Sequence, residues 1–528
     1  MNPSVKSTGH GPPSAVGLEL TADELAGALL SLDPARRLHL LDSGSARGGG
    51  ARLLVAGFDP VEYVEAHGEE LRVWSRGERI ARVVRGDVLA LLDERLAERR
   101  SRGSLSDSVF GPQAGDLAAL NLDGRGACFV TLSYELARQF ERLRLKAPAP
   151  REEGEPDAVL AFFDALAVHD YARGTSFLVG ADAGPERLRQ TAETLLGAAE
   201  VWRRNGGPER PRAGREESGR ETTGPPPAFG PALVAAGAAL RLPPGVRSNF
   251  TRGEYEAAVE RVREHIRAGD IYQANLTQRV VCPPRAGAGP EEVFRRLRAG
   301  HPAAFGAFLR QGARTVVSAS PERFLRVGVE PGGGRVVEAW PIKGTRPRGR
   351  DAVEDARLRS ELLASEKDRA ENVMIVDLMR NDLGRVCRYG SVEVSELCSL
   401  QEHPTLFHLV SKVRGRLRDG VTAGELLRAA FPCGSVTGAP KLRAMEILDE
   451  IERAPRGVSM GSIGYFGFGG AADLNVAIRT VTFGPEGSAR FHVGGGVVAD
   501  SSPAAEYDET LVKARAVLCA LGATDPAD

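Results

Sequence analysis

The sequence predicts an α+β protein in which strands and helices are distributed over two lobes. Short apolar runs of strand length recur along the chain, and longer stretches with apolar residues at helical spacing lie between them. A segment at 205–232, rich in Gly, Pro, Arg and Glu, separates the two lobes. At 528 residues the chain is too long for one ordinary domain. We therefore expect two domains, or one large intertwined core with an added lobe.

Composition excludes several classes of function. Hydrophobic residues make up 42% and charged residues 26%, and the net charge is −1, so we expect no nucleic acid and no acidic membrane surface as partner. No apolar run reaches membrane-spanning length, and the N-terminus has no apolar signal segment. The six cysteines show no C-x-x-C spacing, which predicts neither a zinc site nor a disulfide framework. A cytoplasmic protein that acts on a small molecule fits best.

The N-terminal lobe is predicted to span 18–204, after a disordered N-terminus at 1–17. Apolar runs bounded by Gly-rich turns predict its strands, and leucines at helical spacing predict its helices. The predicted strands are 38–43, 52–58, 159–171 and 175–179, and the predicted helices are 87–102 and 188–203. We expect 205–232 to be a flexible linker.

The C-terminal lobe, 233–528, contains almost every residue pattern that suggests chemistry. Its predicted helices are 252–268, 290–298, 351–383, 423–430, 442–451 and 504–521. Its predicted strands are 271–281, 304–309, 315–318, 323–329, 461–468, 474–483 and 490–498.

Lys343 lies between Ile342 and Gly344 in an otherwise apolar stretch at 339–346. If its amine were buried there, desolvation would favour the neutral form and make it a usable nucleophile or base. The alternative is a strand-end lysine whose ammonium remains in water.

Two predicted helices carry pairs of carboxylates one turn apart. These are Asp368 with Glu371, and Glu506 with Glu509, followed by Lys513. Each pair alone could be a solvated helix face. Facing carboxylates from two helices are, however, what Mg²⁺ requires, with water and a substrate carboxylate completing its octahedron.

Other residues suggest contacts to an anionic substrate. Glycines at 494–496 and the stretch 435–441 could present free backbone N–H groups, although such glycines are often turn or packing residues. Arg479 is a charged residue in an apolar strand and should pair with an anion. With Tyr465 and Lys513, these residues predict a site for a substrate with two carboxylates. His408 could be a hydrogen-bonded core histidine or a site residue, and Glu322 could be a simple capping carboxylate or a functional one.

Six motifs in one order resemble the chorismate-utilising enzymes of the anthranilate synthase component I family. They lie at 320–324, 341–345, 377–386, 434–441, 461–465 and 506–510. The resemblance covers residues 250 to 520 and implies an anthranilate-synthase-like fold of two large, mostly antiparallel sheets packed face to face, with helices outside. Within the family, Pro-Ile-Lys-Gly-Thr at 341–345 is similar to para-aminobenzoate synthase component I, whereas anthranilate synthase component I typically has Ala in place of Lys. Gln273 stands where the isochorismate- and salicylate-forming relatives carry a lysine that activates water, so water is not the expected nucleophile.

The resemblance also implies roles for individual residues. Lys343 would attack C2 of chorismate while Glu322 protonates the leaving C4 hydroxyl, and ammonia would then add at C4 and expel the lysine. Mg²⁺ would be held by Glu371 and Glu509, with Asp368 and Glu506 in support through water. The residues expected to bind the substrate are His408, Thr437, Gly438, Tyr465, Arg479, Gly494, Gly496 and Lys513.

The resemblance implies partners as well. The chain shows no glutaminase-like Gly-x-Cys-x-Gly motif, so ammonia should come from a separate glutamine amidotransferase. The stretch that ends in Ser43 is similar to the family's N-terminal tryptophan-site segment, which leaves a bound tryptophan open. Residues 301–304 lack the Asn-Pro-Ser of the tryptophan-inhibited relatives, so feedback inhibition is in doubt. Whether the product serves folate or antibiotic synthesis is not encoded in any of these motifs.

Overall fold

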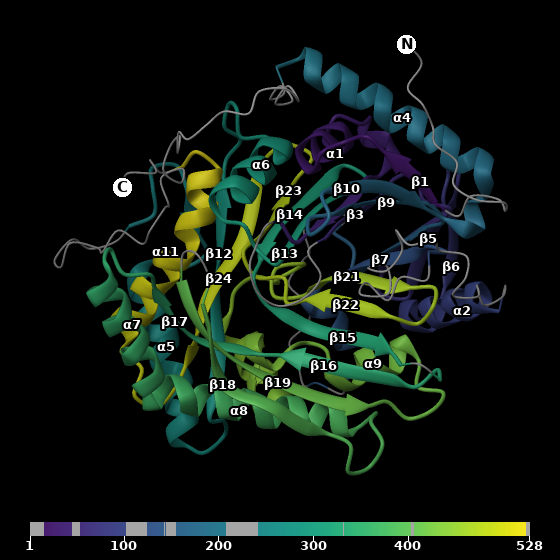
Figure 1. Ribbon diagram of the computed structural model, residues 1–528. Helices are drawn as coiled ribbons and strands as arrows, with labels where there is room; N and C mark the ends of the chain where they lie inside the picture. Colours follow the sequence, from purple (N-terminus) through teal and green to yellow (C-terminus); the bar gives the residue numbers. More distant parts are fainter. Residues whose placement is uncertain are drawn as a thin grey trace.

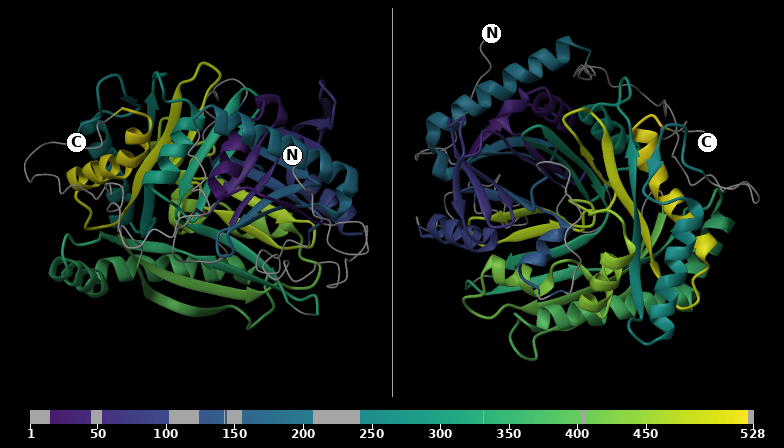
Figure 2. Two further views of the ribbon diagram at one scale, coloured as in Figure 1. Left: turned by 45° about the horizontal axis from the view of Figure 1, so that its top comes forward. Right: turned by 180° about the vertical axis from the view of Figure 1, so that it is seen from behind.

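A computed structural model describes residues 15–44, 53–101, 124–141, 143, 155–206, 241–330, 332–402 and 406–523. Within these ranges the strands form two twelve-stranded sheets whose paired strands run antiparallel (Figure 1). The sheets pack against each other and helices cover their outer faces, which confirms the predicted α+β class and the two-sheet architecture (Figures 1 and 2). No helix in the described part of the chain is both long and apolar enough to cross a membrane.

Each sheet takes strands from both sides of the segment 205–232. The first sheet has the order β1 (Ala15–Leu18), β10 (Thr175–Val179), β9 (Leu166–Asp170), β3 (Leu53–Gly57), β2 (His39–Asp42), β13 (Phe305–Gln311), β14 (Arg314–Ser320), β23 (Thr480–Phe483), β24 (Ala489–Val497), β12 (Gln273–Cys282) and β11 (Arg247–Ser248), with β20 (Gly438–Ala439) beside β12. The second has the order β17 (Ile342–Pro347), β19 (Leu406–Arg416), β16 (Arg335–Trp340), β15 (Arg323–Val329), β22 (Ala472–Asn475), β21 (Ser462–Gly467), β7 (Ala127–Leu132), β8 (Ala158–Phe163), β4 (Glu62–His67), β5 (Glu70–Ser75) and β6 (Arg82–Arg85), with β18 (Glu393–Glu402) beside β19. The core is therefore shared by both halves of the sequence.

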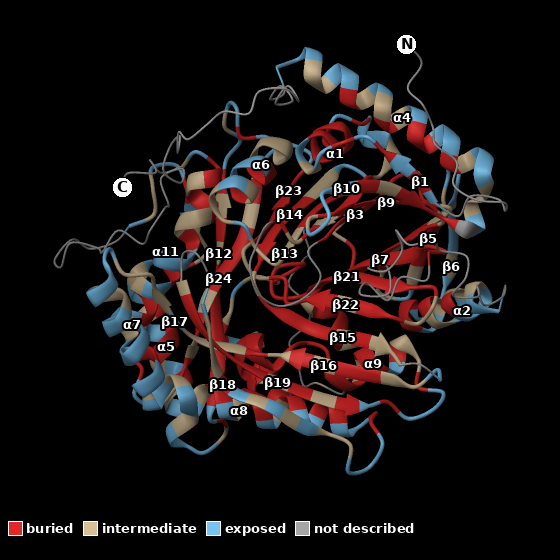
Figure 3. Cartoon of the chain, viewed as in Figure 1, coloured by how far each residue is buried: buried red, intermediate tan, exposed pale blue. Residues whose placement is uncertain are grey.

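Helices bury one face against each sheet and leave the other in water (Figure 3). The outer face of the first sheet packs against α1 (Ala22–Leu30), α4 (Gly184–Arg204), α6 (Pro290–Gly300) and α11 (Pro503–Ala520). The second sheet packs against α2 (Val88–Arg100), α8 (Glu366–Gly384) and α9 (Ala423–Ala430). Beside β12 and β24 lie α5 (Arg252–Arg267) and α10 (Lys441–Ile451), and α7 (Ala352–Ala364) packs on β17. Short 3₁₀ turns are η1 (Pro34–Arg36), η4 (Tyr134–Gln139), η5 (Ala181–Ala183) and η6 (Gly434–Val436).

Three helices begin at a Thr followed three residues later by Glu. At the start of α1, for example, the Thr21 hydroxyl accepts from the Glu24 amide, and the Glu24 carboxylate accepts from the Thr21 amide. The same reciprocal caps start α5 and α9. Each cap satisfies two amides that a helix start leaves unpaired, so these boundaries are set locally.

The helix predicted at 351–383 is wrong in one respect, because it is broken at Ser365. Ser365 has an extended backbone (φ −67°, ψ 102°), ends α7 and caps α8 by accepting from the Asp368 amide at 3.2 Å. A serine that offers its hydroxyl to a following amide competes with helix continuation. Periodicity alone did not reveal this break.

Two predicted strands are each divided between the sheets. The run 159–171 forms β8 in the second sheet and β9 in the first, and the run 474–483 forms β22 and β23 in the same way. The second crossing passes through Arg479 in a left-handed conformation (φ 51°). Apolar alternation continues through such a crossing because both ends are buried, so the sequence pattern does not mark it.

Parts of the sequence interpretation fall on segments that the structure does not describe. Residues 1–14 of the predicted disordered N-terminus lie outside the described residues, while Ala15 to Gly17 form most of β1. Of the predicted linker, residues 207–232 likewise lie outside the described residues.

The interior between the sheets should be sensitive to loss of an aromatic side chain. Phe129 on β7 is 1% exposed and meets Phe163 edge to face, with ring centroids 5.3 Å apart. We expect Phe129→Ala to lower the free energy of unfolding by about 3–5 kcal/mol, because it removes buried apolar area and leaves a cavity. Denaturant unfolding measures this change. Val83→Ala, at a side chain 57% exposed, should change it by no more than about 0.5 kcal/mol, and an equal effect of both variants would contradict the assigned core.

Candidate active site

Lys343 lies at the edge of the second sheet, one residue into β17. The register of β17 against β19 shifts between Lys343 and Thr345, where Gly344 has φ 82°. A methyl group on Gly344 would lie 3.0 Å from the Asp368 Cβ on α8, so only glycine fits this bulge closely. Lys343 is partly exposed, so the fully buried setting considered from the sequence is wrong, because β17 is an edge strand.

Glu322 lies where the chain crosses from β14 in the first sheet to β15 in the second. It is 5% exposed, and its Oε1 atom has no hydrogen-bond partner. Burial raises the pKa of this carboxyl to about 7, although Lys343, the Ser435 side chain and the Ile342 amide act in the opposite direction. A carboxyl that keeps its proton near neutral pH can act as a general acid.

A second wall of the site is the junction of β12 with β24 and β20. Gln273 pairs with Ala439, and Asn275 pairs with Gly496. A methyl group on Gly496 would clash with the Gln273 amide and would lie 3.6 Å from Lys343 Nζ. Gln273 is 1% exposed and its Oε1 atom has no hydrogen-bond partner. The Lys343 amine, the Gln273 side chain and Gly496 therefore meet at one point.

The predicted carboxylates of α8 and α11 act on one another and on Lys343. Burial raises the pKa of Glu371, and Asp368 and Glu506 add to this, while Lys343 and Lys367 oppose it. Burial also raises the pKa of Glu506, with Glu509 adding to it. For Glu509 burial acts in the same direction, but Lys513, Lys367 and Lys343 outweigh it and lower the pKa. The two helices thus face each other across the site, which the sequence could not show.

The donor set fits a cation bound by few protein ligands. Within the described ranges, no three or more His, Cys, Asp or Glu side chains converge to hold a metal ion between them. Glu506 is buried and accepts from Ser501 at 2.7 Å, and a methyl group on Gly495 would lie 3.0 Å from its other oxygen. Neighbouring carboxylates held in a partly desolvated site with a glycine backbone beside them suit a hard cation that keeps several waters. They do not form a closed cage of protein ligands.

The turn 434–438 holds two of the predicted pocket residues. Thr437 is fully buried, and its hydroxyl donates to the carbonyls of Cys433 and Gly434 at 3.2 and 3.3 Å. A methyl group on Gly438 would lie 2.8 Å from the Ala444 Cβ and would clash with the Gln273 carbonyl, so the turn packs tightly on β12 and α10. This turn closes the side of the site next to Glu322.

The remaining predicted residues lie at different distances from this centre. His408 on β19 is buried and its Nδ1 is 2.8 Å from the Thr345 hydroxyl, two residues from Lys343. Lys513 forms an ion pair with Glu509 at 2.7 Å and donates to the Gly494 carbonyl at 3.1 Å. These contacts place both residues beside the site.

Arg479 lies on the segment that crosses between the sheets, and Tyr465 lies on β21 in the core between them. The Arg479 carbonyl accepts from the Ala319 amide, and its guanidinium has no hydrogen-bond or ion-pair partner among the described residues. Burial lowers the pKa of this guanidinium, because a buried cation without a neighbouring anion is poorly stabilised. Tyr465 packs against Phe129 between the sheets, with ring centroids 6.4 Å apart.

Ser43 lies in a different region, where β2 meets β3. Its hydroxyl accepts from the Leu53 amide at 2.7 Å and donates to the Leu53 carbonyl at 3.1 Å. The neighbouring Asp42 carboxylate accepts from Tyr171 and Arg298, both at 2.7 Å. A tryptophan at this position stays a prediction, and both polar side chains already have protein partners.

Sequence reasoning did not single out Ser435, Lys367 or Arg456. Ser435 and Lys367 gain significance only from their effects on Glu322, Glu371 and Glu509. For Arg456 a signal existed, because Glu452 stands four residues before it, a spacing at which an acid and a base can pair.

Comparison with known proteins identifies the family. The model of the chorismate binding enzymes matches residues 112–519. The chain belongs to the chorismate-binding enzyme family.

Relatives with two different names resemble this enzyme to a similar degree. Anthranilate synthase component 1 of Streptomyces coelicolor is 41% identical over 74% of this chain and 71% of that protein. Aminodeoxychorismate synthase component 1 of Bacillus subtilis is 33% identical over 96% of this chain and 97% of that protein. The crystal structure of anthranilate synthase component I from Streptococcus pneumoniae superposes with a TM-score of 0.67 and 26% identity, over 89% of this chain and 93% of that one. The chain is thus a chorismate-utilising enzyme of the anthranilate synthase component I family.

The protonation of Glu322 can be measured directly. Because burial raises its pKa to about 7, we expect a protonated carboxyl that titrates near pH 7 instead of near 4.5. The infrared band of a protonated carboxylic acid, taken as the difference between the parent enzyme and Glu322→Gln, should persist at pH 6 and disappear by about pH 8. A difference band that is already lost at pH 5 would contradict this environment.

Proposed function

We propose that this enzyme is aminodeoxychorismate synthase component I, which converts chorismate and ammonia into 4-amino-4-deoxychorismate. The observation that supports this choice is the position of Lys343, whose amine lies beside Gly496 and Gln273 and acts electrostatically on Glu322. An amine and a carboxyl that keeps its proton to about pH 7, close enough for the amine to act on the carboxyl, suit attack on a ring carbon together with departure of a hydroxyl. The aminodeoxychorismate synthase relative gives further support.

The first step proposed is addition of the unprotonated Lys343 amine to C2 of chorismate. As the C–N bond forms, the ring double bonds shift and the C4–O bond breaks. Glu322 gives its proton to the leaving oxygen, which departs as water. The result is a covalent amine adduct at C2.

The second step reverses the allylic shift with a different nucleophile. Ammonia attacks C4, the double bonds return, and the C2–N bond to Lys343 breaks. Lys343 departs as a neutral amine, and the proton released by the added nitrogen returns to the Glu322 carboxylate, which becomes a protonated carboxyl again. Chorismate and ammonia thus give 4-amino-4-deoxychorismate and water, and the enzyme returns to its starting state. Gln273 offers an amide here, which cannot remove a proton from water as a basic amine could.

Binding of the substrate anions is assigned to the cationic and amide groups around this centre. The Arg479 guanidinium, which has no partner among the described residues, and the backbone at Gly494 and Gly496 would hold carboxylate oxygens. Tyr465, Thr437, Gly438, His408 and Lys513 would complete the pocket. Mg²⁺ would be held by Glu371 and Glu509, with Asp368 and Glu506 in support, and when bound it would neutralise the ring carboxylate.

Ammonia is proposed to come from a separate glutamine amidotransferase subunit. The product would then serve para-aminobenzoate formation, and so folate synthesis, after elimination of the enolpyruvyl side chain. Ammonium salts should replace the amidotransferase in a test tube, which makes the purified chain testable alone.

The product distinguishes the two family activities. With chorismate, Mg²⁺ and ammonium at mildly alkaline pH, we expect a product with the mass of aminodeoxychorismate that aminodeoxychorismate lyase converts to para-aminobenzoate. Lys343→Ala should lower this rate by roughly 100-fold or more, because it removes the nucleophile. Lys412→Ala, which removes a lysine paired with Glu396 on the neighbouring strand, is the matched control and should keep the rate. Formation of anthranilate by the parent enzyme would refute the proposed activity.

The proposed cation site can be tested by binding as well as by activity. We expect Mn²⁺, as a spectroscopic stand-in for Mg²⁺, to bind the enzyme and to be displaced by Mg²⁺ in electron paramagnetic resonance. Glu371→Gln should weaken this binding by at least about 10-fold. Glu366→Gln, at an exposed position on the same helix, should leave it unchanged. Equal binding by both variants, or turnover that survives EDTA, would exclude this site.

A further inference from the structure

A buried guanidinium lies behind the active site and contacts both of its walls. Arg456 is 4% exposed, and its Nε and one terminal nitrogen donate to the two oxygens of Glu452 at 2.8 and 2.7 Å. Its other bonds go to backbone carbonyls, to Val436 from Nη1 and to Asn275 from Nη2, both at 2.7 Å. Burial disfavours the charged form, but Glu452 raises the pKa of Arg456 overall, so the guanidinium stays charged.

The two carbonyls belong to segments that meet at the reacting groups. Val436 lies between Ser435, which acts on Glu322, and Thr437 of the predicted ring pocket. Asn275 lies on β12, two residues after Gln273 and opposite Gly496. The Asn275 amide also donates to the Thr437 carbonyl at 2.8 Å. Arg456 therefore fixes the turn 434–438 against β12 where the two segments flank the site.

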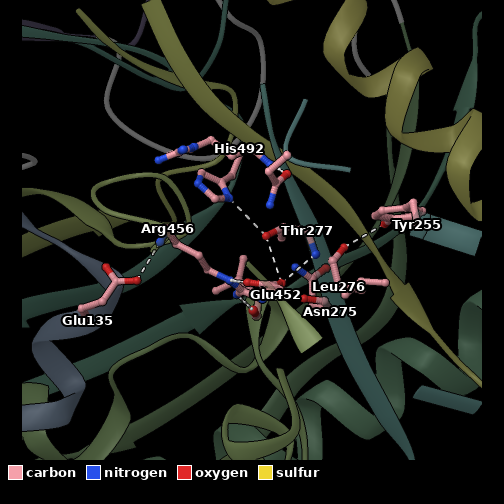
Figure 4. A network of polar contacts seen from close by, with 11 residues as sticks. Glu135, Tyr255, Asn275, Leu276, Thr277, Glu452, Arg456 and His492 are labelled. Carbon is pink, nitrogen blue, oxygen red and sulfur yellow. Dashed lines mark hydrogen bonds and ion pairs between the residues drawn. The ribbon is translucent and has the colours of Figure 1, made fainter. Parts of the chain in front are cut away.

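The arginine is itself held from three sides, as Figure 4 shows. Glu452 accepts from the Thr277 amide at 2.7 Å, and the Thr277 hydroxyl lies 3.2 Å from His492 Nδ1. The Glu135 carboxylate of η4 accepts from the backbone amides of Arg456 and Gly457 at 2.7 and 2.9 Å. Strand β12, helix α10 and the N-terminal half thus all determine where the guanidinium lies.

We propose that Arg456 is a positioning residue for the chorismate reaction, which sets the distance between the turn that carries Ser435 and the strand that carries Gln273. Arg456 does not touch the reacting groups and acts through Val436 and Asn275. The inference concerns any chemistry in which Glu322 donates a proton, and in that respect it rests on the proposed function.

Lysine cannot replace this arginine. The planar guanidinium donates to a carboxylate along one edge and to two carbonyls with its remaining N–H groups, whereas an ammonium has three donors at one point. Arg456→Lys keeps the charge but loses at least one of the two carbonyls. A shift of about 1 Å at a reacting group can lower a rate by about 100-fold.

The test combines two variants and a pH profile. We expect Arg456→Lys to lower kcat for chorismate consumption by about 10- to 100-fold. We expect Ser435→Ala to lower kcat similarly. The double variant should be little worse than either single variant, because Arg456 acts on Glu322 through Ser435 and both changes interrupt this one connection. The limb of the profile that reports Glu322 should move to higher pH in both single variants, at constant free ammonia, since the Ser435 contact lowers that pKa. The charged or ionisable groups that face Glu322 are Lys343 of β17 and Cys433 before η6, and neither is altered.

Controls separate positioning from a loss of folding. Arg453→Lys changes an arginine on the same segment whose side chain is 53% exposed and pairs with Glu254, and should keep kcat. If Arg456→Lys does not fold, by circular dichroism, Glu452→Gln replaces it, because this isosteric change weakens the same anchor. A kcat within threefold of the parent, or losses that multiply in the double variant with no movement of the limb, would overturn the proposal. Chorismate consumption is measured whichever amine product forms, so failure of the proposed product assignment would be seen separately.

Discussion

The antiparallel pairing of β12 with β24 is the constraint on which the active site depends. It places Asn275 opposite Gly496, so that the Gln273 side chain and the Lys343 amine both lie close to the Gly496 backbone. A side chain at Gly496 would occupy the space in which these groups meet. The pairing also positions α11, which packs beside β24, so that Glu506 lies close enough to act electrostatically on Glu371 of α8.

The groups proposed to react or to bind the substrate lie on irregular backbone held by regular structure. Glu322 lies at a crossing between the two sheets, Lys343 precedes a bulge at Gly344, and Arg479 has a left-handed backbone. At each of these positions the regular strand hydrogen bonding is interrupted while the neighbouring strands remain paired. The side chain can therefore point in a different direction without disrupting the fold. Arg456 adds a further support, since its guanidinium donates to the backbone carbonyls of Val436 and Asn275.

Electrostatics gives these groups different tasks. Burial raises the pKa of Glu322 to about 7, whereas at Glu509 the neighbouring Lys513 outweighs burial and lowers the pKa of the carboxyl. Within one site, the Glu322 carboxyl therefore suits a proton donor, whereas Glu509 suits the role of an anion.

The sequence by itself predicted most helices and the family, and it singled out the residues that are proposed to react. Helix α9 was predicted with the bounds 423–430 that the structure has, and its start is fixed by local hydrogen bonding at Thr422, whereas helix α1 with its Thr21–Glu24 cap was not predicted. Only the tertiary structure decided which strands cross between sheets at 164–165 and 476–479, because buried strands show the same apolar pattern on both sides of a crossing. It also decided that Lys343 is partly exposed, that α8 and α11 face each other, and that Arg456 joins Val436 to Asn275. These facts arise from segments far apart in the chain, and no local pattern encodes the distance between them.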